Sequence, residues 1–187
     1  MQRRLVTASL LASAVLLATA CSSAGPTADP ESKRRSIDAN VDNATAQLYA
    51  QVKGSRELVA KSRGILVFPK VVSAGLVLAG SYGEGSLQAS GGRTYYSTGS
   101  ASVGLTAGAD SKAVFVLFLT DEALKKFQAS KGWTAGVDAS VALATVGADG
   151  SIDTATAKSP VIGFVLTNGG LMANLSIEGT KINKMAL

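Results

Sequence analysis

The stretch "LAGSYGEGS", Leu78–Ser86, places three glycines among strand-forming residues, and its interpretation decides the fold class. A Walker-type phosphate loop, G-x-x-x-x-G-K-[ST], is excluded because no lysine follows Gly85. A dinucleotide fingerprint, G-x-G-x-x-G, is excluded because "GSYGEG" has the reverse spacing and strand-like sequence on both sides. The glycines instead predict bends, bulges or close approach of backbones in a strongly curved sheet. The positions concerned are Gly75, Gly80, Gly83 and Gly85.

Short apolar segments rich in Val, Leu, Ile and Phe follow one another from Gly64 to the end of the chain, with turn residues between them. Examples are "GILVFP" (64–69), "KAVFVLFLT" (112–120) and "PVIGFVLTN" (160–168). This pattern predicts a mostly antiparallel sheet that closes on itself or folds into a sandwich. One short helix is expected within it, because Thr120 can cap "DEALKKFQAS" and place Leu124 and Phe127 on one face.

A longer amphipathic helix is predicted before the strands, over residues 36–62. Apolar or small residues recur there at steps of three or four, acidic residues lie near the start, and Gly64 is a natural stop. The predicted fold class is therefore α+β. We expect the apolar stripe to pack on the sheet, with insertion into lipid as the alternative. The stripe consists of Ile37, Val41, Ala44, Leu48, Val52, Ser55 and Val59.

The first twenty residues are predicted to be an export signal. Arg3 and Arg4 form a charged start, and the apolar segment Leu5–Leu17 is too short to cross a bilayer. The segment "LATAC", Leu17–Cys21, resembles a bacterial lipobox, with Ala18 in place of the usual Leu or Val. That resemblance implies cleavage before Cys21 and acylation of its thiol and its new amino terminus.

The alternative is plain cleavage after Ala20, which would release a soluble periplasmic protein with a free thiol. We favour the lipoprotein, because a lone exposed thiol is a liability in an oxidising compartment. Ser22 after the cysteine points to the outer membrane. Residues 21–35 are expected to be the acylated cysteine and a flexible tether, and residues 36–187 one domain.

The charge distribution argues against nucleic acid as a ligand. Without Arg3 and Arg4, 16 basic residues stand against 13 acidic ones, and a formal charge of +3 is too small for a basic stripe. The excess of basic residues is concentrated between Gln51 and Lys70, where five basic residues stand against the single acid Glu57. Near an anionic leaflet each such charge contributes about 1 kcal/mol, and the alternative is a solvated helix face. The predicted lipid-binding residues are Lys53, Arg56, Lys61, Arg63 and Lys70.

No catalytic, metal or cofactor site is predicted. The chain has no histidine, which removes Ser-His-Asp triads and the usual zinc sites. Asp121 and Glu122 suit a capped helix start better than paired acid and base catalysis. The carboxylates of Asp138, Asp149 and Asp153 form at most a weak calcium site.

Four blocks of sequence, in order, resemble the SYLF domain family, which is also labelled an actin-binding domain after its yeast member. They are "AKSRGILVFPKVVSAGLVLAGSYGEGSL" (60–87), "SASVGLTAGADSKAVFVLFLTDEALKKF" (100–127), "GWTAGVDASVALATVGADG" (132–150) and "PVIGFVLTNGGLMANLSIEGTKI" (160–182). The chain departs from the members' usual residues at Ala79, Thr106 and Asp110, and near Tyr96. The resemblance implies a lipid-binding domain, because relatives are described as binding phosphoinositide membranes and some bind actin filaments.

Together these observations predict a non-enzymatic exported lipoprotein that associates with anionic phospholipid and faces the periplasm. Actin is not an expected partner for an exported protein. The alternative is an envelope scaffold or carrier that binds an apolar ligand or a protein partner. The sequence does not indicate an oligomeric state.

Overall fold

The computed structural model describes residues 29–75, 78–103, 108–144, 152, 158–167, 170–171, 177 and 179–187. The helices in this part of the chain are α1 (Pro30–Gln51), α2 (Ser55–Lys61) and α3 (Asp121–Ala129). The long strands are β1 (Gly64–Gly75), β2 (Leu78–Ala89), β3 (Gly92–Val103), β4 (Gly108–Phe118) and β7 (Val161–Thr167). The short strands are β5 (Trp133–Thr134), β6 (Ala142–Leu143), β8 (Gly170–Leu171) and β9 (Lys181–Lys184).

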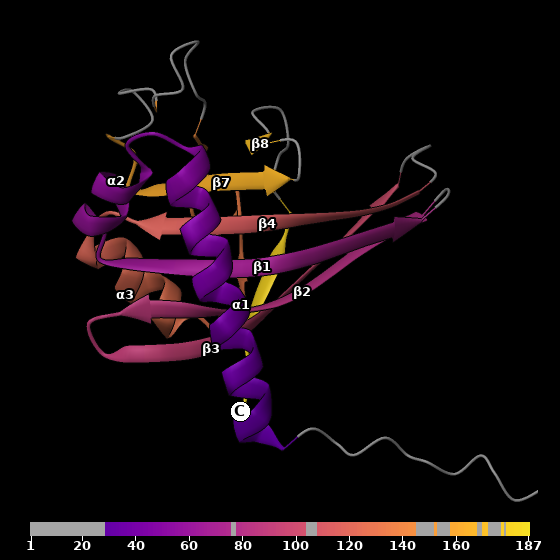
Figure 1. Ribbon diagram of the computed structural model, residues 1–187. Helices are drawn as coiled ribbons and strands as arrows, with labels where there is room; N and C mark the ends of the chain where they lie inside the picture. Colours follow the sequence, from indigo (N-terminus) through magenta and orange to yellow (C-terminus); the bar gives the residue numbers. More distant parts are fainter. Residues whose placement is uncertain are drawn as a thin grey trace, which may run out of the picture.

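The strands form one strongly curled sheet, a half-barrel in the order β5-β9-β3-β2-β1-β4-β7-β6, with β8 added beside β7. All pairings between these strands are antiparallel except that of β6 with β7. The predicted α+β class with a mostly antiparallel, strongly curved sheet is confirmed. Figure 1 shows α1 crossing one face of the sheet and α3 lying behind it.

The central strands are buried on both faces. In β1, Ile65 and Val67 face the side that α1 covers, whereas Leu66 and Phe68 face the inside of the curl. Consecutive apolar residues therefore enter two different cores, as the short apolar runs of the sequence require. The inner core contains the clustered rings of Phe118, Phe127 and Trp133, with centroids 4.8–6.5 Å apart.

The outer core is closed by α1, whose buried residues fall on one stripe. Ile37, Val41, Ala44 and Leu48 pack in the same cluster as the outward side chains of the central strands. Polar contacts fix the helix at its edge: Arg93 on β3 pairs with Asp38 at 3.0 Å and with Asp42 at 2.5 Å. The stripe therefore packs on the sheet, as expected from its spacing.

A β-bulge interrupts the middle of β1. From Val67 to Lys70, β1 advances by three residues while its partner β2 advances by two. The register of β1 against β4 shifts at the same place, between Phe68 and Val71. Pro69 lies inside the bulge, which is where a central strand can tolerate a residue without an N–H. A bulge bends its strand and increases the local twist, so it accounts for curvature at this point.

Two of the predicted glycines stand opposite this bulge. A Cβ on Gly85 would meet the carbonyl oxygen of Val67, and a Cβ on Gly83 would lie 2.9 Å from the carbonyl oxygen of Lys70. The prediction of close backbone approach is correct at these two positions. At Gly80 a Cβ would meet nothing within 4 Å, so close approach does not explain that glycine.

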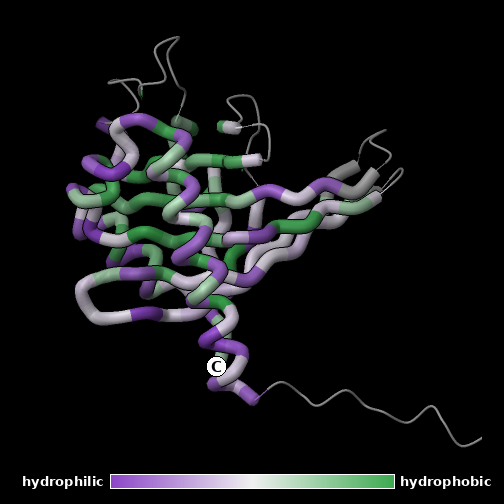
Figure 2. Tube along the Cα trace, viewed as in Figure 1, coloured by the Kyte–Doolittle hydropathy of each residue, from purple (hydrophilic) through white to green (hydrophobic). Residues whose placement is uncertain are grey.

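The bulge separates two halves of the strands β1 to β4. Figure 1 shows one half lying under the helices and the other extending beyond them, and Figure 2 shows apolar residues concentrated in the covered half. We call the first the packed half and the second the projecting half. The packed half comprises residues 64–68, 85–89, 92–96 and 113–118, and the projecting half comprises residues 70–75, 78–84, 97–103 and 108–112.

The predicted helix over 36–62 is wrong in its extent. The structure has two helices there, separated at Val52–Gly54, because Gly54 takes a left-handed conformation with φ of 84°. The first helix begins at Pro30, so residues 30–35 of the expected tether are helical. The helix α3 is as predicted, since the Thr120 hydroxyl accepts a hydrogen bond from the Ala123 N–H at 3.2 Å.

Candidate functional site

The five basic residues predicted to bind lipid are all exposed, but they lie in two places. Lys53 connects α1 to α2, whereas Arg56 and Lys61 lie on α2 and Arg63 directly precedes β1. Lys70 lies beyond the bulge, roughly 20 Å further along β1 at about 3.3 Å per residue. The structure therefore gathers four of the five residues around α2 and places Lys70 apart.

Two of the four residues around α2 already have partners. The Arg56 guanidinium stacks 4.4 Å from the centroid of the Tyr49 ring, and Arg63 Nε lies 3.5 Å from Asp121 Oδ2. Both members of the Arg63 pair are more than half exposed, so the pair is weak and screened by salt. In the part of the chain that the structure describes, no ion pair is formed by Lys53 or Lys61.

Lys70 borders an open groove of about 720 Å³ between the first turns of α1 and the projecting half. Within this outer groove Val72 on β1 and Tyr82 on β2 are direct cross-strand partners. Their exposures of 41% and 57% are high for large apolar side chains. The outer groove thus combines an exposed apolar pair with a lysine two residues away on the same strand.

A polar contact joins α1 to β2 at the outer groove. Lys33 Nζ on α1 lies 2.8 Å from Glu84 Oε1, and the Tyr82 hydroxyl donates a hydrogen bond of 2.7 Å to the same oxygen. Partial burial works to raise the pKa of Glu84, but the hydrogen bonds from Lys33 and Tyr82 outweigh it and leave that pKa below 4.5. The hydrogen bond to Glu84 in turn raises the pKa of Tyr82 above 10.

The part that α1 plays in this groove was not predicted. Lys33, Ser36 and Asn40 line it, although residues up to 35 were assigned to the tether. The available signal was "DPE", Asp29–Glu31, because Pro is favoured in the first turn of a helix and acidic residues suit its start. The exposure of Val72 and Tyr82 could not be predicted from the sequence, because both residues lie in segments that look like ordinary strands.

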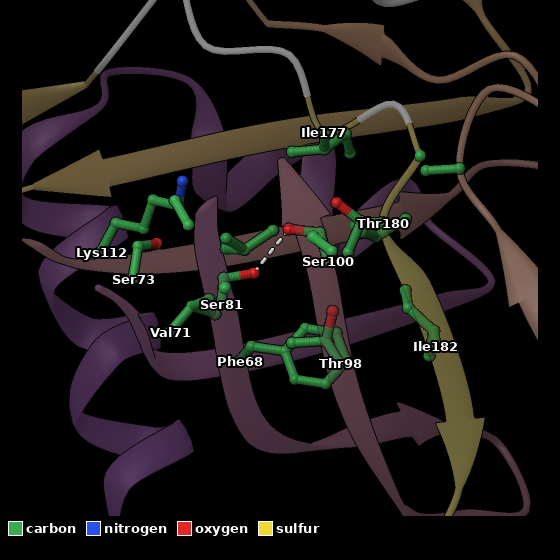
Figure 3. Close-up of a pocket in the computed structure, with 17 residues that line it drawn as sticks. Phe68, Val71, Ser73, Ser81, Thr98, Ser100, Lys112, Ile177, Thr180 and Ile182 are labelled. Atoms are coloured by element: carbon green, nitrogen blue, oxygen red, sulfur yellow. Dashed lines mark hydrogen bonds between the residues drawn. The ribbon is translucent and has the colours of Figure 1, made fainter. Parts of the chain in front are cut away.

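The inside of the curl contains a second hollow, a cavity of about 260 Å³ shown in Figure 3. Its floor is made of buried residues of the inner core, and its rim carries hydroxyl groups and one amine. The floor residues are Phe68, Val71, Val114, Val116, Ile177 and Ile182. The polar lining residues are Ser73, Ser81, Thr98, Ser100, Lys112 and Thr180.

The polar side of this inner cavity lies toward the ends of the projecting strands. Along β4 the inward side chains run from Val116 through Val114 to Lys112, and along β1 from Phe68 through Val71 to Ser73. The hydroxyls of Ser81 and Ser100 lie 2.7 Å apart and bond to each other across β2 and β3. Along β1 and β4, polarity therefore rises from the packed half toward the projecting half.

The acidic candidates that the structure describes do not assemble into a site. Asp121 and Glu122 lie in the first turn of α3, and the Asp138 carboxylate accepts a hydrogen bond from the Thr134 N–H within a turn. Asp149, Asp153, Cys21 and Thr106 lie outside the described residues. Across the described ranges, no three potential metal ligands come together. Of the helices in that part of the chain, none combines the length and the apolar character that crossing a bilayer requires.

Comparison with known families supports the resemblance found in the sequence. The model of the Ysc84 family, described as "Las17-binding protein actin regulator", matches residues 99–186. This range runs from the end of β3 through β4, α3 and β7 to β9. The predicted relation to the SYLF domain family is thereby confirmed. A comparison with curated proteins found no match.

Proposed function

We propose, from the premise that this chain carries a SYLF (Ysc84) domain, that it is a non-catalytic exported lipoprotein that binds phospholipid membranes. The family match supports a domain of the lipid-binding or actin-binding type. The family's description concerns actin regulation in its own members. An exported domain would not meet actin, and we therefore assign lipid as the partner.

The observation that carries this proposal is the exposed pair Val72 and Tyr82 beside Lys70. A tyrosine ring suits the boundary between headgroups and acyl chains, because its body is apolar and its hydroxyl is polar. A lysine two residues away on the same strand adds about 1 kcal/mol of attraction to an anionic leaflet. The outer groove thus offers the chemical groups that an interfacial contact requires.

The basic residues around α2 provide a second electrostatic contact in this proposal. Lys53 and Lys61 are exposed, and within the described residues neither forms an ion pair. Acyl chains on Cys21 would hold the domain at the leaflet, so that weak contacts through the two surfaces remain engaged. We place the anchored protein in the cell envelope, at the outer membrane and facing the periplasm.

The proposal is tested by flotation of protein that starts at Ser22, which has no acyl chains, with vesicles of anionic or neutral phospholipid at low salt. We expect binding to the anionic vesicles only. Lys61→Glu, Arg63→Glu and Lys70→Glu together should reduce it more than tenfold, at about 1 kcal/mol for each charge. Val72→Ser with Tyr82→Ser should reduce it by removing the apolar contact.

The matched control is Lys125→Glu with Lys126→Glu, which reverses two exposed lysines on α3. These changes should alter binding less than the changes around α2 and in the outer groove do. Failure of the unmodified protein to float with anionic vesicles at low salt would refute the proposal. Palmitate labelling tests the anchor separately, since the label should disappear in Cys21→Ser.

The inner cavity favours a second candidate function, a carrier for an apolar ligand. A carrier predicts that the protein without acyl chains does not bind vesicles and that it co-purifies with lipid. Vesicle flotation of the protein without acyl chains distinguishes the two functions, and mass spectrometry identifies any lipid that the purified protein carries.

A further inference from the structure

We propose that the inner cavity binds a single-chain lipid with an anionic headgroup, and that Lys112 holds the headgroup. The inference deepens the lipid-binding function, on which it rests for the class of ligand. It concerns the inside of the curl and not the outer groove. The two sites lie on opposite faces of the sheet, so an experiment can refute either one without refuting the other.

The lining of the cavity matches an alkyl chain at one end and a polar group at the other. Phe68 and Val116 on the floor are 1% exposed, and Ile182 on β9 is 4% exposed. A buried apolar floor does not hold ordered water, because a buried water needs two to four polar partners. The floor is therefore suited to the methylene groups of a ligand.

The volume limits the ligand to one chain. The cavity of about 260 Å³ is larger than a hollow of ~150 Å³ that accommodates benzene, and it lies just below the usual range for small-molecule sites, ~300–1,000 Å³. A single alkyl chain fits such a space with its head at the end where Lys112 lies. The paired chains of an intact phospholipid do not.

The headgroup position follows from the only charged side chain among the described lining residues. Lys112 is partly buried, and no ion pair to it occurs in the described part of the chain. Ser73 is its diagonal neighbour across β1 and β4, and Figure 3 shows the two side chains at the same end of the cavity. An ammonium beside a hydroxyl donates charge-assisted hydrogen bonds to a carboxylate or a phosphate.

Photo-crosslinking of the full chain in membranes tests this assignment. The probes share one diazirine-bearing alkyl chain and differ in the head, which is a carboxylate (a fatty acid), a phosphate (a lysophosphatidic acid) or a neutral hydroxyl (a fatty alcohol). We expect the anionic probes to label peptides that contain the floor residues Phe68, Val71 or Val114. The ratio of carboxylate to phosphate labelling identifies which head the site prefers.

Lys112→Gln should lower labelling of the floor by the anionic probes about tenfold and leave labelling by the alcohol unchanged. Lys125→Gln, a change of the same kind on the exposed face of α3, is the matched control and should have no effect. Ala79→Phe places a ring at the cavity wall and should reduce floor labelling by all three probes. Melting temperatures equal to that of the unmodified chain establish that the variants are folded.

Labelling confined to residues outside the cavity would overturn the proposal. Equal floor labelling by acid and alcohol, insensitive to Lys112→Gln, would also overturn it. In either case, vesicle flotation of Lys112→Gln should match that of the unmodified protein, because the proposed membrane contact lies on the other face. If the protein with the original sequence does not float but the floor of its cavity is labelled, only the proposed membrane contact is refuted.

Discussion

The packed half and the projecting half of the sheet are built from the same four strands but stand in different surroundings. Val67 and Val72 illustrate the difference, since both lie on the outer face of β1, at 0% and 41% exposure. The packed half is covered by helices on both faces, whereas the projecting half leaves a groove outside and a cavity inside. The same strands thus form a closed core in one half and exposed or hollow surfaces in the other.

The largest expected effect comes from the boundary between the halves. Gly85→Ala places a Cβ against the Val67 carbonyl oxygen, which belongs to the backbone of a central strand and cannot move aside. We expect a loss of about 4 kcal/mol or more in the free energy of unfolding, the range seen when a core is disrupted. Urea denaturation measures it.

Gly80→Ala is the matched control on the same strand, because nothing lies within 4 Å of the added Cβ. Its free energy of unfolding should stay within about 1 kcal/mol of the original value. Equal losses for the two variants would show that the bulge does not require a glycine opposite it.

The second prediction compares equal truncations in the two halves. Val67→Ala removes two buried methyl groups from the outer core and should cost about 2–3 kcal/mol. Val72→Ala removes the same groups from a partly exposed position and should change stability by less than about 0.5 kcal/mol. Thermal denaturation of the two variants side by side gives the difference. A loss at Val72 as large as that at Val67 would mean that the projecting half is packed in solution.

The third prediction concerns the attachment of α1 to β3. Arg93→Met keeps much of the side chain but removes the pairs with Asp38 and Asp42, and should cost about 1 kcal/mol. The loss should shrink as salt is added, because Asp42 is largely exposed. Denaturation at low and high salt tests this, and a loss independent of salt would assign the effect to packing instead.

The smallest expected effect depends on pH and lies in the projecting half. The pKa of Glu84 is held below 4.5, so its pairing with Lys33 contributes stability above that pH. That contribution, less than about 1 kcal/mol for a partly exposed pair, should disappear as the pH falls through the lowered pKa. Glu84→Gln should remove this part of the acid dependence. Identical acid titration of the stability of both proteins would contradict the assignment.

The sequence was most informative where local chemistry determines structure. Thr120 and the residues after it predicted α3, and the short apolar runs predicted strands buried in a curved sheet. Gly83 and Gly85 were correctly interpreted as sites of close backbone approach. Each of these predictions depends on residues that are near one another in the chain or on a strict steric requirement.

The remaining features depend on contacts between distant segments. The apolar segment 64–69 stops at Pro69, but β1 continues through it because a bulge accommodates a residue without an N–H. Pro30 suggested a tether, although proline also begins helices, and α1 extends over it. The position of Lys112 in the inner cavity could not be predicted from the sequence, since it results from the pairing of β4 with β1.

The bulge at Pro69 has a consequence for how this sheet can vary. Because one extra residue produces it, deleting Pro69 alone would restore the ordinary alternation, with Phe68 still facing inward and Lys70 outward. Every neighbouring side chain would keep its face, while the bend would be relaxed. A loss of three nucleotides would thus be enough to relax the curvature of the wall without exchanging any interior residue for an exterior one.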